Sequence, residues 1–148
     1  MKKVMSLIIV LSMCLSLCAC GSSSPAIKDE ETAPHIVETK KATVEYVGYQ
    51  FDDDSLNILH VNFKYNNTGD DANSLHFTVQ IKAYQDGKEL HCHMMDGVSD
   101  DILPGYDNTC TYSFILDSME SPVLIQYSSW GISKVISEFT IDIASNEN

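Results

Sequence analysis

Arginine is absent from this chain of 148 residues, and its only fixed cations are the side chains of nine lysines. Twenty-one Asp and Glu residues outnumber them and give a formal net charge of −12. Proteins that bind nucleic acid neutralise phosphates with Lys and Arg, so the composition argues against a nucleic-acid partner. It also argues against a domain that lies flat on anionic lipid. An acidic surface of this kind is typical of a domain whose net charge keeps it in solution.

The sequence also lacks the short motifs that carry common enzyme chemistry. It contains no Gly-x-Ser-x-Gly elbow, no His-Glu-x-x-His pair and no glycine-rich phosphate loop. Paired carboxylates occur only in predicted turns, at Asp52–Asp54, Asp70–Asp71 and Asp100–Asp101. Acidic loops can hold calcium through oxygen ligands, but none of these has the spacing of an EF-hand, and adjacent aspartates in turns usually bond to their own backbone. We therefore expect no enzymatic activity and no cofactor.

The N-terminal segment contains the motif that predicts a location. Two lysines at positions 2 and 3 precede an uncharged apolar stretch, which ends in Leu-Cys-Ala-Cys at residues 17–20. A basic start, a short apolar run and a small residue before a cysteine form an export signal with a lipobox. Val4–Ala19 is 16 residues long, shorter than the roughly 20 that span a bilayer. The sequence therefore predicts cleavage before Cys20 and a diacylglyceryl lipid on its sulfur.

Three parts of the chain follow from this assignment. Residues 1–19 are the predicted signal peptide, and residues 20–41 are the lipidated cysteine with a flexible tether of irregular, Ser-, Lys- and Glu-containing sequence. Residues 42–148 are the predicted folded domain. Loss of the signal leaves seven lysines against 21 acidic residues, a net charge of −14. We expect the protein at the cell membrane, held by its lipid and facing outside the cytoplasm.

Hydrophobic and polar residues alternate through most of the predicted domain, which is typical of half-buried β-strands. The most regular example is Leu75–Ala83, with Phe77 near its centre. About seven such strands in about 100 residues, joined by turns rich in Gly, Pro, Asn and Asp, predict an all-β fold, an antiparallel β-sandwich of immunoglobulin-like type. The other alternating segments are 44–49, 59–65, 90–94, 110–116, 123–127 and 135–143.

The dipeptide Asp86-Gly87 predicts a type I′ hairpin, because both positions tolerate a positive φ. A two-residue loop at this point fixes the register of the strands on either side. Ile81 would then face Cys92 on the core side, and Lys82 would face His91 on the outer side.

Several segments in a fixed order resemble a known family. They are Phe-Lys-Tyr-Asn-Asn-Thr at 63–68, Tyr-Gln-Asp-Gly-Lys-Glu-Leu at 84–90, Ile-Leu-Pro-Gly at 102–105 and Tyr-Ser-Phe-Ile-Leu-Asp at 112–117. The pattern is similar to that of Gram-positive surface lipoproteins with an immunoglobulin-like (telokin-like) domain of unknown function, over roughly residues 42–143. The resemblance implies the fold and the surface location. It implies no activity, and no site residue follows from it.

A short segment rich in metal-ligating side chains contains His91, Cys92, His93 and Met94. Imidazole, thiolate and thioether groups all suit copper or zinc. On a regular strand the two histidines point to one face and the cysteine and methionine to the other, so the four cannot converge without a bulge. The alternatives are an ordinary exposed hairpin end and a metal site at His91 and His93.

Cys92 and Cys110 are the only cysteines that follow Cys20. Both fall on the inward face of their predicted strands, and an exported protein meets conditions that permit a disulfide. A bridge between them is one expectation, and two separate buried thiols that pack as small apolar groups are the other.

Trp130 is the single tryptophan of the chain. It either closes one end of the core or is an exposed aromatic anchor for a ligand, and exposure of Tyr106 beside it would favour the second alternative. The function we expect is that of a non-catalytic binding module at the cell surface. Its partner would be a surface protein, a peptide or a wall component, and the alternative function is copper or zinc binding through the segment 91–93.

Replacement of Cys20 by serine tests the predicted lipidation. Ala19 is the only small residue that precedes a cysteine in the signal region. Cys20→Ser should therefore abolish palmitate labelling and leave uncleaved precursor, as seen by metabolic labelling and gel mobility. Labelling that survives this change, or that disappears in Cys18→Ser alone, would contradict the assignment.

Overall fold

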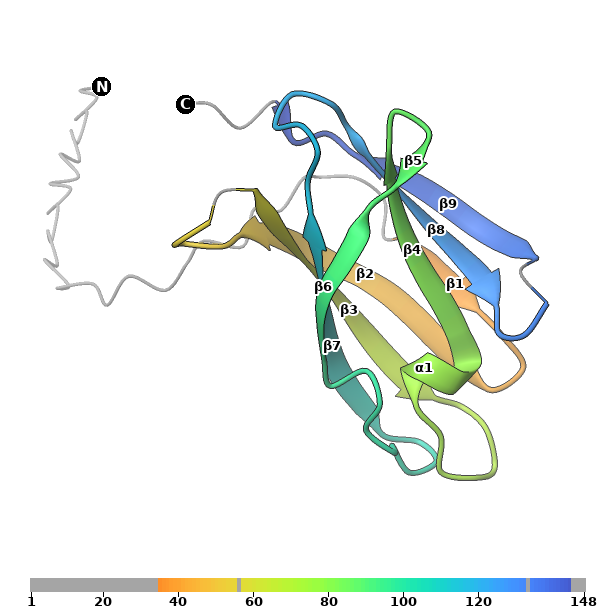
Figure 1. Cartoon of the computed structure of the whole chain (residues 1–148). Helices are drawn as coiled ribbons and strands as arrows, with labels where there is room; N and C mark the ends of the chain where they lie inside the picture. The colour runs from red at the N-terminus through yellow and green to blue at the C-terminus, as the bar shows by residue number, and fades with distance from the viewer. Residues whose placement is uncertain (1–34, 56, 133, 145–148) are drawn as a thin grey trace, which may run out of the picture.

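The computed structural model describes residues 35–55, 57–132 and 134–144 (Figure 1). Within these residues no helix is long and apolar enough to cross a membrane. The predicted signal peptide and Cys20 lie outside them. The elements are β1 (Ile36–Glu38), β2 (Ala42–Phe51), β3 (Ile58–Asn67), α1 (Leu75–Thr78), β4 (Val79–Gln85), β5 (Lys88–Glu89), β6 (His91–Asp96), β7 (Asp107–Ile115), β8 (Val123–Ser129) and β9 (Val135–Ile141).

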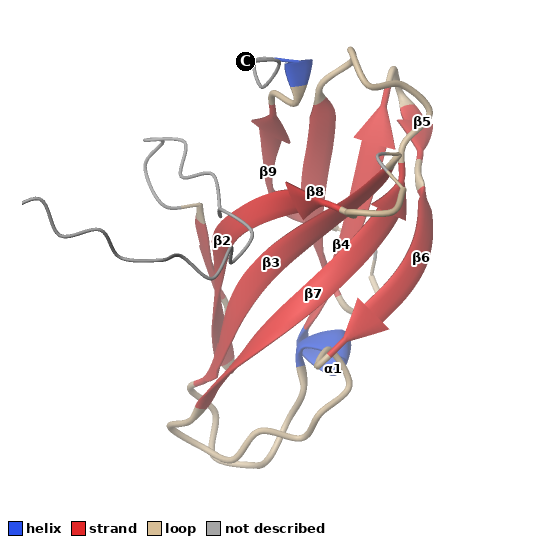
Figure 2. Ribbon diagram, turned by 90° about the vertical axis from the view of Figure 1, so that its left-hand side faces the viewer, coloured by secondary structure: helices blue, strands red, loops and turns tan. Residues whose placement is uncertain are grey.

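Two antiparallel sheets pack face to face, as Figures 1 and 2 show. One sheet has the strand order β1-β2-β3-β7-β6 and the other the order β5-β4-β8-β9. The chain crosses between the sheets after β3, β5 and β7, which is the Greek-key order of immunoglobulin-like sandwiches. The predicted all-β sandwich is confirmed.

Aromatic side chains fill the space between the two sheets. Phe63 of β3 is fully buried and meets the ring of Tyr127 of β8 edge-on at a centroid distance of 6.0 Å. The ring of Tyr46 on β2 lies 4.7 Å from that of Phe139 on β9. Both pairs span the sandwich, and edge-to-face or tilted ring contacts of this kind add to the stability gained by burial.

The folded domain begins earlier than the sequence predicts. Residues 36–38, assigned to the flexible tether, form β1, which pairs with β2. Val37 is only 3% exposed, and the ring of His35 stacks on Phe139 at 4.2 Å. A strand of three residues is too short to show a period, so the sequence pattern could not separate it from a linker.

The predicted strand from Leu75 is wrong over its first four residues. Leu75–Thr78 form one turn of helix, and β4 begins at Val79. Leu75 is buried, but Phe77 is 59% exposed and lies outside the core. The Thr78 hydroxyl donates to the Ser74 carbonyl at 2.8 Å, a local bond that favours the helical turn. Alternation over four residues does not distinguish a helical turn from a strand.

The predicted hairpin at residues 86–87 is confirmed at its turn. Asp86 and Gly87 have φ values of 50° and 79°, as a type I′ turn requires, and the Leu90 amide donates to the Ala83 carbonyl at 2.8 Å.

Beyond Leu90 the predicted register is wrong, because the chain leaves this sheet. β6 pairs with β7 in the other sheet, so Cys92 lies opposite Phe114 rather than Ile81. Lys82 forms an ion pair with Glu89 at 2.8 Å and does not face a histidine. A turn motif fixes the register of a hairpin but does not indicate where a strand changes sheets.

Two phenylalanine-to-alanine changes distinguish the observed core from the predicted one. Phe63→Ala should lower the free energy of unfolding by about 3–5 kcal/mol, because it leaves a cavity between the sheets. Phe77→Ala should lower it by less than about 1 kcal/mol, because the side chain is mostly in solvent. Urea unfolding of both variants measures the difference. Equal losses of unfolding free energy in the two variants would mean that Phe77 packs in the core, which would contradict the observed helix.

Candidate functional site at the loop end

One end of the sandwich, here called the loop end, gathers five connecting segments (Figure 1). Five of the twelve large hydrophobic side chains that are exposed in the described part of the chain belong to these segments: Phe77, Leu103, Tyr106, Trp130 and Ile132. Two more, Val135 and Ile136, begin β9 directly beside it. In soluble proteins such a concentration of exposed apolar groups is more common at interaction surfaces than elsewhere. The segments are residues 39–41, 68–74, α1, 97–106 and the described residues 130–132 and 134.

A buried asparagine holds the two longest of these segments together. Asn67 is 0% exposed, and its side-chain amide donates to the carbonyls of Asp71 (2.8 Å) and Ile102 (2.7 Å). Its side-chain carbonyl accepts from the Gly69 amide at 3.0 Å. Its backbone amide donates to the Tyr106 carbonyl, also at 3.0 Å. Residue 67 therefore fixes segment 68–74 against segment 97–106.

Three rings, which we call the aromatic cluster, stand beside these segments. Trp130 lies 4.7 Å from His76 and 5.9 Å from Phe77, measured between ring centroids. The His76 amide donates to the Val98 carbonyl at 3.0 Å and so ties α1 to segment 97–106. Trp130 remains 43% exposed, so it is an exposed aromatic group and does not close the end of the core.

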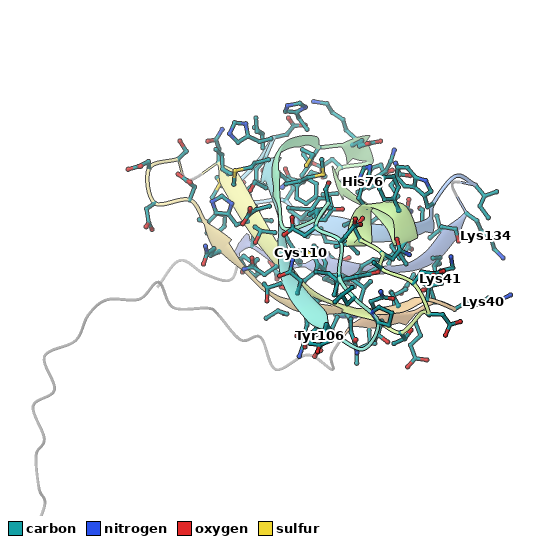
Figure 3. The ribbon with its side chains drawn as sticks, turned by 90° about the horizontal axis from the view of Figure 1, so that it is seen from below. Lys40, Lys41, His76, Tyr106, Cys110 and Lys134 are labelled. Carbon is teal, nitrogen blue, oxygen red and sulfur yellow. The ribbon has the colours of Figure 1, made fainter. Side chains whose placement is uncertain are left out.

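Tyr106, the second predicted ligand contact, is 67% exposed at the loop end. In Figure 3, which looks at the molecule from below, Tyr106 and His76 lie on opposite sides of this end. The structure therefore places Tyr106 on the same surface as Trp130 without bringing it into the aromatic cluster.

The two predicted metal-binding histidines lie on an exposed edge strand. A bulge between Cys92 and Met94 interrupts the pairing of β6 with β7 at His93. Among the described residues, no group of three or more His, Cys, Asp or Glu side chains is placed to hold a metal ion. Burial also raises the pKa of the Cys92 thiol, which disfavours the thiolate that a soft metal needs. The arrangement of β6 gives no support to a site at His91 and His93.

The two cysteines are not brought together, so the expected disulfide is not formed. Cys92 lies opposite Phe114, four residues along β7 from Cys110, and both thiols are free. Four residues of strand span about 13 Å, whereas a disulfide needs Cα atoms within about 7 Å. Burial, with smaller contributions from Asp100 and Asp96, raises the pKa of Cys110 to about 12. The two residues are separate thiols, which is the alternative expectation.

A hydrogen-bonded chain of Asp, His and Ser also joins the β2–β3 connection, β3 and β7, and sequence reasoning missed it. His60 Nδ1 lies 2.7 Å from Ser113 Oγ, and His60 Nε2 lies 3.2 Å from Asp52 Oδ2. The hydrogen bond from His60 is the largest of the effects that lower the pKa of the Asp52 carboxyl. Ser113 is 0% exposed, so no substrate reaches its hydroxyl. The chain joins the β2–β3 connection to β7 and is structural.

Comparison with known proteins places the chain in a family. A family model described as a domain of unknown function, DUF5067, matches residues 18–129. The chain belongs to this family. The DUF5067 match includes α1 and ends one residue before Trp130. A search of curated proteins found no match.

A solved structure agrees on the fold of this DUF5067 domain. An uncharacterized β-sandwich protein from Clostridium difficile 630 is similar, with a TM-score of 0.51 over 83% of this chain and 99% of its own length. The two sequences are only 10% identical, so the likeness shows the fold alone.

Two matched substitutions test how the loop end is held. Asn67→Asp keeps the size of the side chain but removes the donors to two carbonyls, so hydrogen exchange should quicken across residues 68–74 and 97–106. Gln85→Glu is the control, because the Gln85 amide donates to the carbonyls of Ser118 and Ser121 at the opposite end. It should quicken exchange across residues 117–121 instead. Each change should cost on the order of 2–5 kcal/mol. An identical exchange pattern in both variants would contradict the role of Asn67.

Proposed function

We propose that this protein is a surface lipoprotein of the DUF5067 family that acts as a non-catalytic binding module. Its lipid is carried by Cys20, and its ligand contacts the loop end. The observation on which the proposal depends is the half-exposed aromatic cluster of His76, Phe77 and Trp130. Tryptophan and other large aromatic side chains dominate the energetics of binding surfaces, and a soluble domain seldom leaves several of them together in water.

The direction of β1 is compatible with a loop end that faces away from the membrane. β1 is antiparallel to β2, and β2 begins at the loop end with Ala42. β1 therefore runs toward the loop end, so its first residue, Ile36, lies farther from that end than its last, Glu38. A flexible tether before β1, as the sequence predicts, would leave the loop end of a domain anchored through Cys20 free to face away from the membrane, where an envelope or external ligand can reach it.

The burial of Ser113 supports the absence of catalysis in this proposal. Ser113 is the serine of the hydrogen-bonded chain with His60 and Asp52, and its hydroxyl lies under neighbouring side chains of the sheet. A nucleophile must approach its substrate within about 3.5 Å in line with the reacting bond, which this burial prevents. The ligand class is a surface protein, a peptide or a wall component.

Retention of the full-length protein on isolated envelope material tests the proposal, provided that the membrane is first removed with detergent so that the lipid on Cys20 cannot hold the protein there. Trp130→Ala should weaken retention at least tenfold, because it removes the central ring of the aromatic cluster. Met119→Ala is the matched control, since Met119 is 42% exposed, close to the 43% of Trp130, but lies in the connection between β7 and β8. Equal retention of the two variants would contradict binding through the loop end.

A further inference from the structure

The lysines in the described part of the chain fall into two groups. Three of the six have a carboxylate partner within 2.8 Å. These are the pairs Lys64–Asp107, Lys82–Glu89 and Lys88–Asp117. All three pairs are set by strand register or by a neighbouring turn, and they leave no net positive charge where they lie.

The other three, Lys40, Lys41 and Lys134, are exposed and form no ion pair with any described residue. Figure 3 places all three on one side of the loop end, and Figure 1 shows the β1–β2 and β8–β9 turns side by side there. Acidic residues outnumber lysines by more than two to one in this chain, so a shortage of carboxylates does not explain this group. Unpaired ammonium groups held close together attract an anion.

A polar hollow of about 360 Å³ opens between the β1–β2 turn and segment 68–74. Its lining includes Lys40, Lys41, Thr68, Asn73 and the carboxylates of residues 70 and 71. The Thr68 amide donates to the Lys41 carbonyl at 2.9 Å, which joins the two walls. An apolar peptide side chain would gain little in such a hollow. A ligand rich in hydroxyl groups would find both donors and acceptors there.

The exposed rings beside the lysines complete the pattern. A sugar ring has an apolar face of C–H groups and a polar edge of hydroxyls, so it packs on aromatic faces that remain half in water. Trp130 and Phe77 present such rings, and Trp130 lies in the same turn as Lys134. Rings, unpaired ammonium groups and a polar hollow therefore occur together at the loop end.

We propose that the loop end binds an anionic polysaccharide. Its sugar rings pack on the aromatic cluster, and its acidic groups lie against Lys40, Lys41 and Lys134. This inference rests on the proposed function, since it names the ligand class of the same surface.

Four carboxylates of the connecting segments at this end oppose an anion, and Glu38 and Asp96 flank those segments. Asp70 and Asp71 line the hollow without pairing with a lysine, and Asp100 and Asp101 lie in segment 97–106. Replacement of Asp70 and Asp71 by asparagine removes their charge but keeps their size, so it tests the sign of the ligand's charge without changing the shape of the hollow. Asp70→Asn with Asp71→Asn should tighten binding of an anionic polysaccharide about threefold or more. A weakening would indicate a cationic ligand and overturn the proposal.

The central experiment uses the full-length protein and polygalacturonate, a carboxylated polysaccharide, with the fluorescence of the single tryptophan as one readout and affinity electrophoresis as the other. Two triple variants carry the same change in net charge. The loop-end variant replaces the unpaired lysines: Lys40→Gln, Lys41→Gln and Lys134→Gln. The control variant replaces the paired lysines: Lys64→Gln, Lys82→Gln and Lys88→Gln. The loop-end variant should bind at least tenfold more weakly than the control variant. Equal weakening would mean that net charge alone governs binding, and the proposal would fall.

Two other polymers test separately whether binding needs the sugar rings and whether it needs the acidic groups of the ligand. Dextran has sugar rings without charge, and polyglutamate has carboxylates without sugar rings. Each should bind at least tenfold more weakly than polygalacturonate, and Phe77→Ala should weaken polygalacturonate binding about fivefold. Polyglutamate binding as tight as polygalacturonate binding would overturn the polysaccharide assignment.

Competition on envelope material separates this inference from the proposed function. If envelope retention depends on Trp130 and polygalacturonate displaces the protein, both the proposed binding function and the polysaccharide ligand class are supported. If retention depends on Trp130 but neither polygalacturonate nor the loop-end lysine variant changes it, the ligand class is wrong and the binding surface remains. If retention is independent of Trp130, both are wrong.

Discussion

The hydrogen bonds of one buried amide determine the shape of the surface to which a function can be assigned. Asn67 ends β3 and satisfies the carbonyls of Asp71 and Ile102 inside the fold, where unpaired carbonyls would be costly. Two long connections are thereby held in fixed positions, although only Val98 and Ile102 of segment 97–106 pack their apolar side chains inward. Their other apolar residues, such as Leu103 and Tyr106, remain in solvent. An exposed apolar surface at this end is thus compatible with a stable sandwich.

Much of the fold follows from period-two alternation, because each sheet buries only one face. Leu59, Val61 and Phe63 of β3 are fully buried, whereas Asn62 between them is not. The turn at residues 86–87 was also predictable, since a positive φ at both positions strongly favours Asp-Gly. These signals are local, and they predicted the sandwich and most of its strands.

The rest depends on contacts between residues far apart in the chain. The sequence does not indicate that β6 leaves the sheet of β4, so it predicted the wrong neighbour for Cys92 and left open a disulfide that the observed register rules out. His60 meets Ser113 only because β3 pairs with β7 in one register. The alternatives for Trp130 were decided by the unpredicted helix α1, whose His76 and Phe77 contact the indole ring outside the core. The three unpaired lysines become a group only when two turns lie side by side.

The central claim is that the loop end is the ligand-binding surface of this family member. Hydrogen-exchange mapping of the full-length protein, free and bound to isolated envelope material, measures that surface directly. The account predicts added protection in residues 39–41, 68–78, 97–106, 130–132 and 134, with no change elsewhere. A second hollow, of about 430 Å³ and lined by Tyr84, Leu124 and Gln126, lies on the outer face of the smaller sheet. Protection confined to that face, or to the exposed edge β6, would contradict the account.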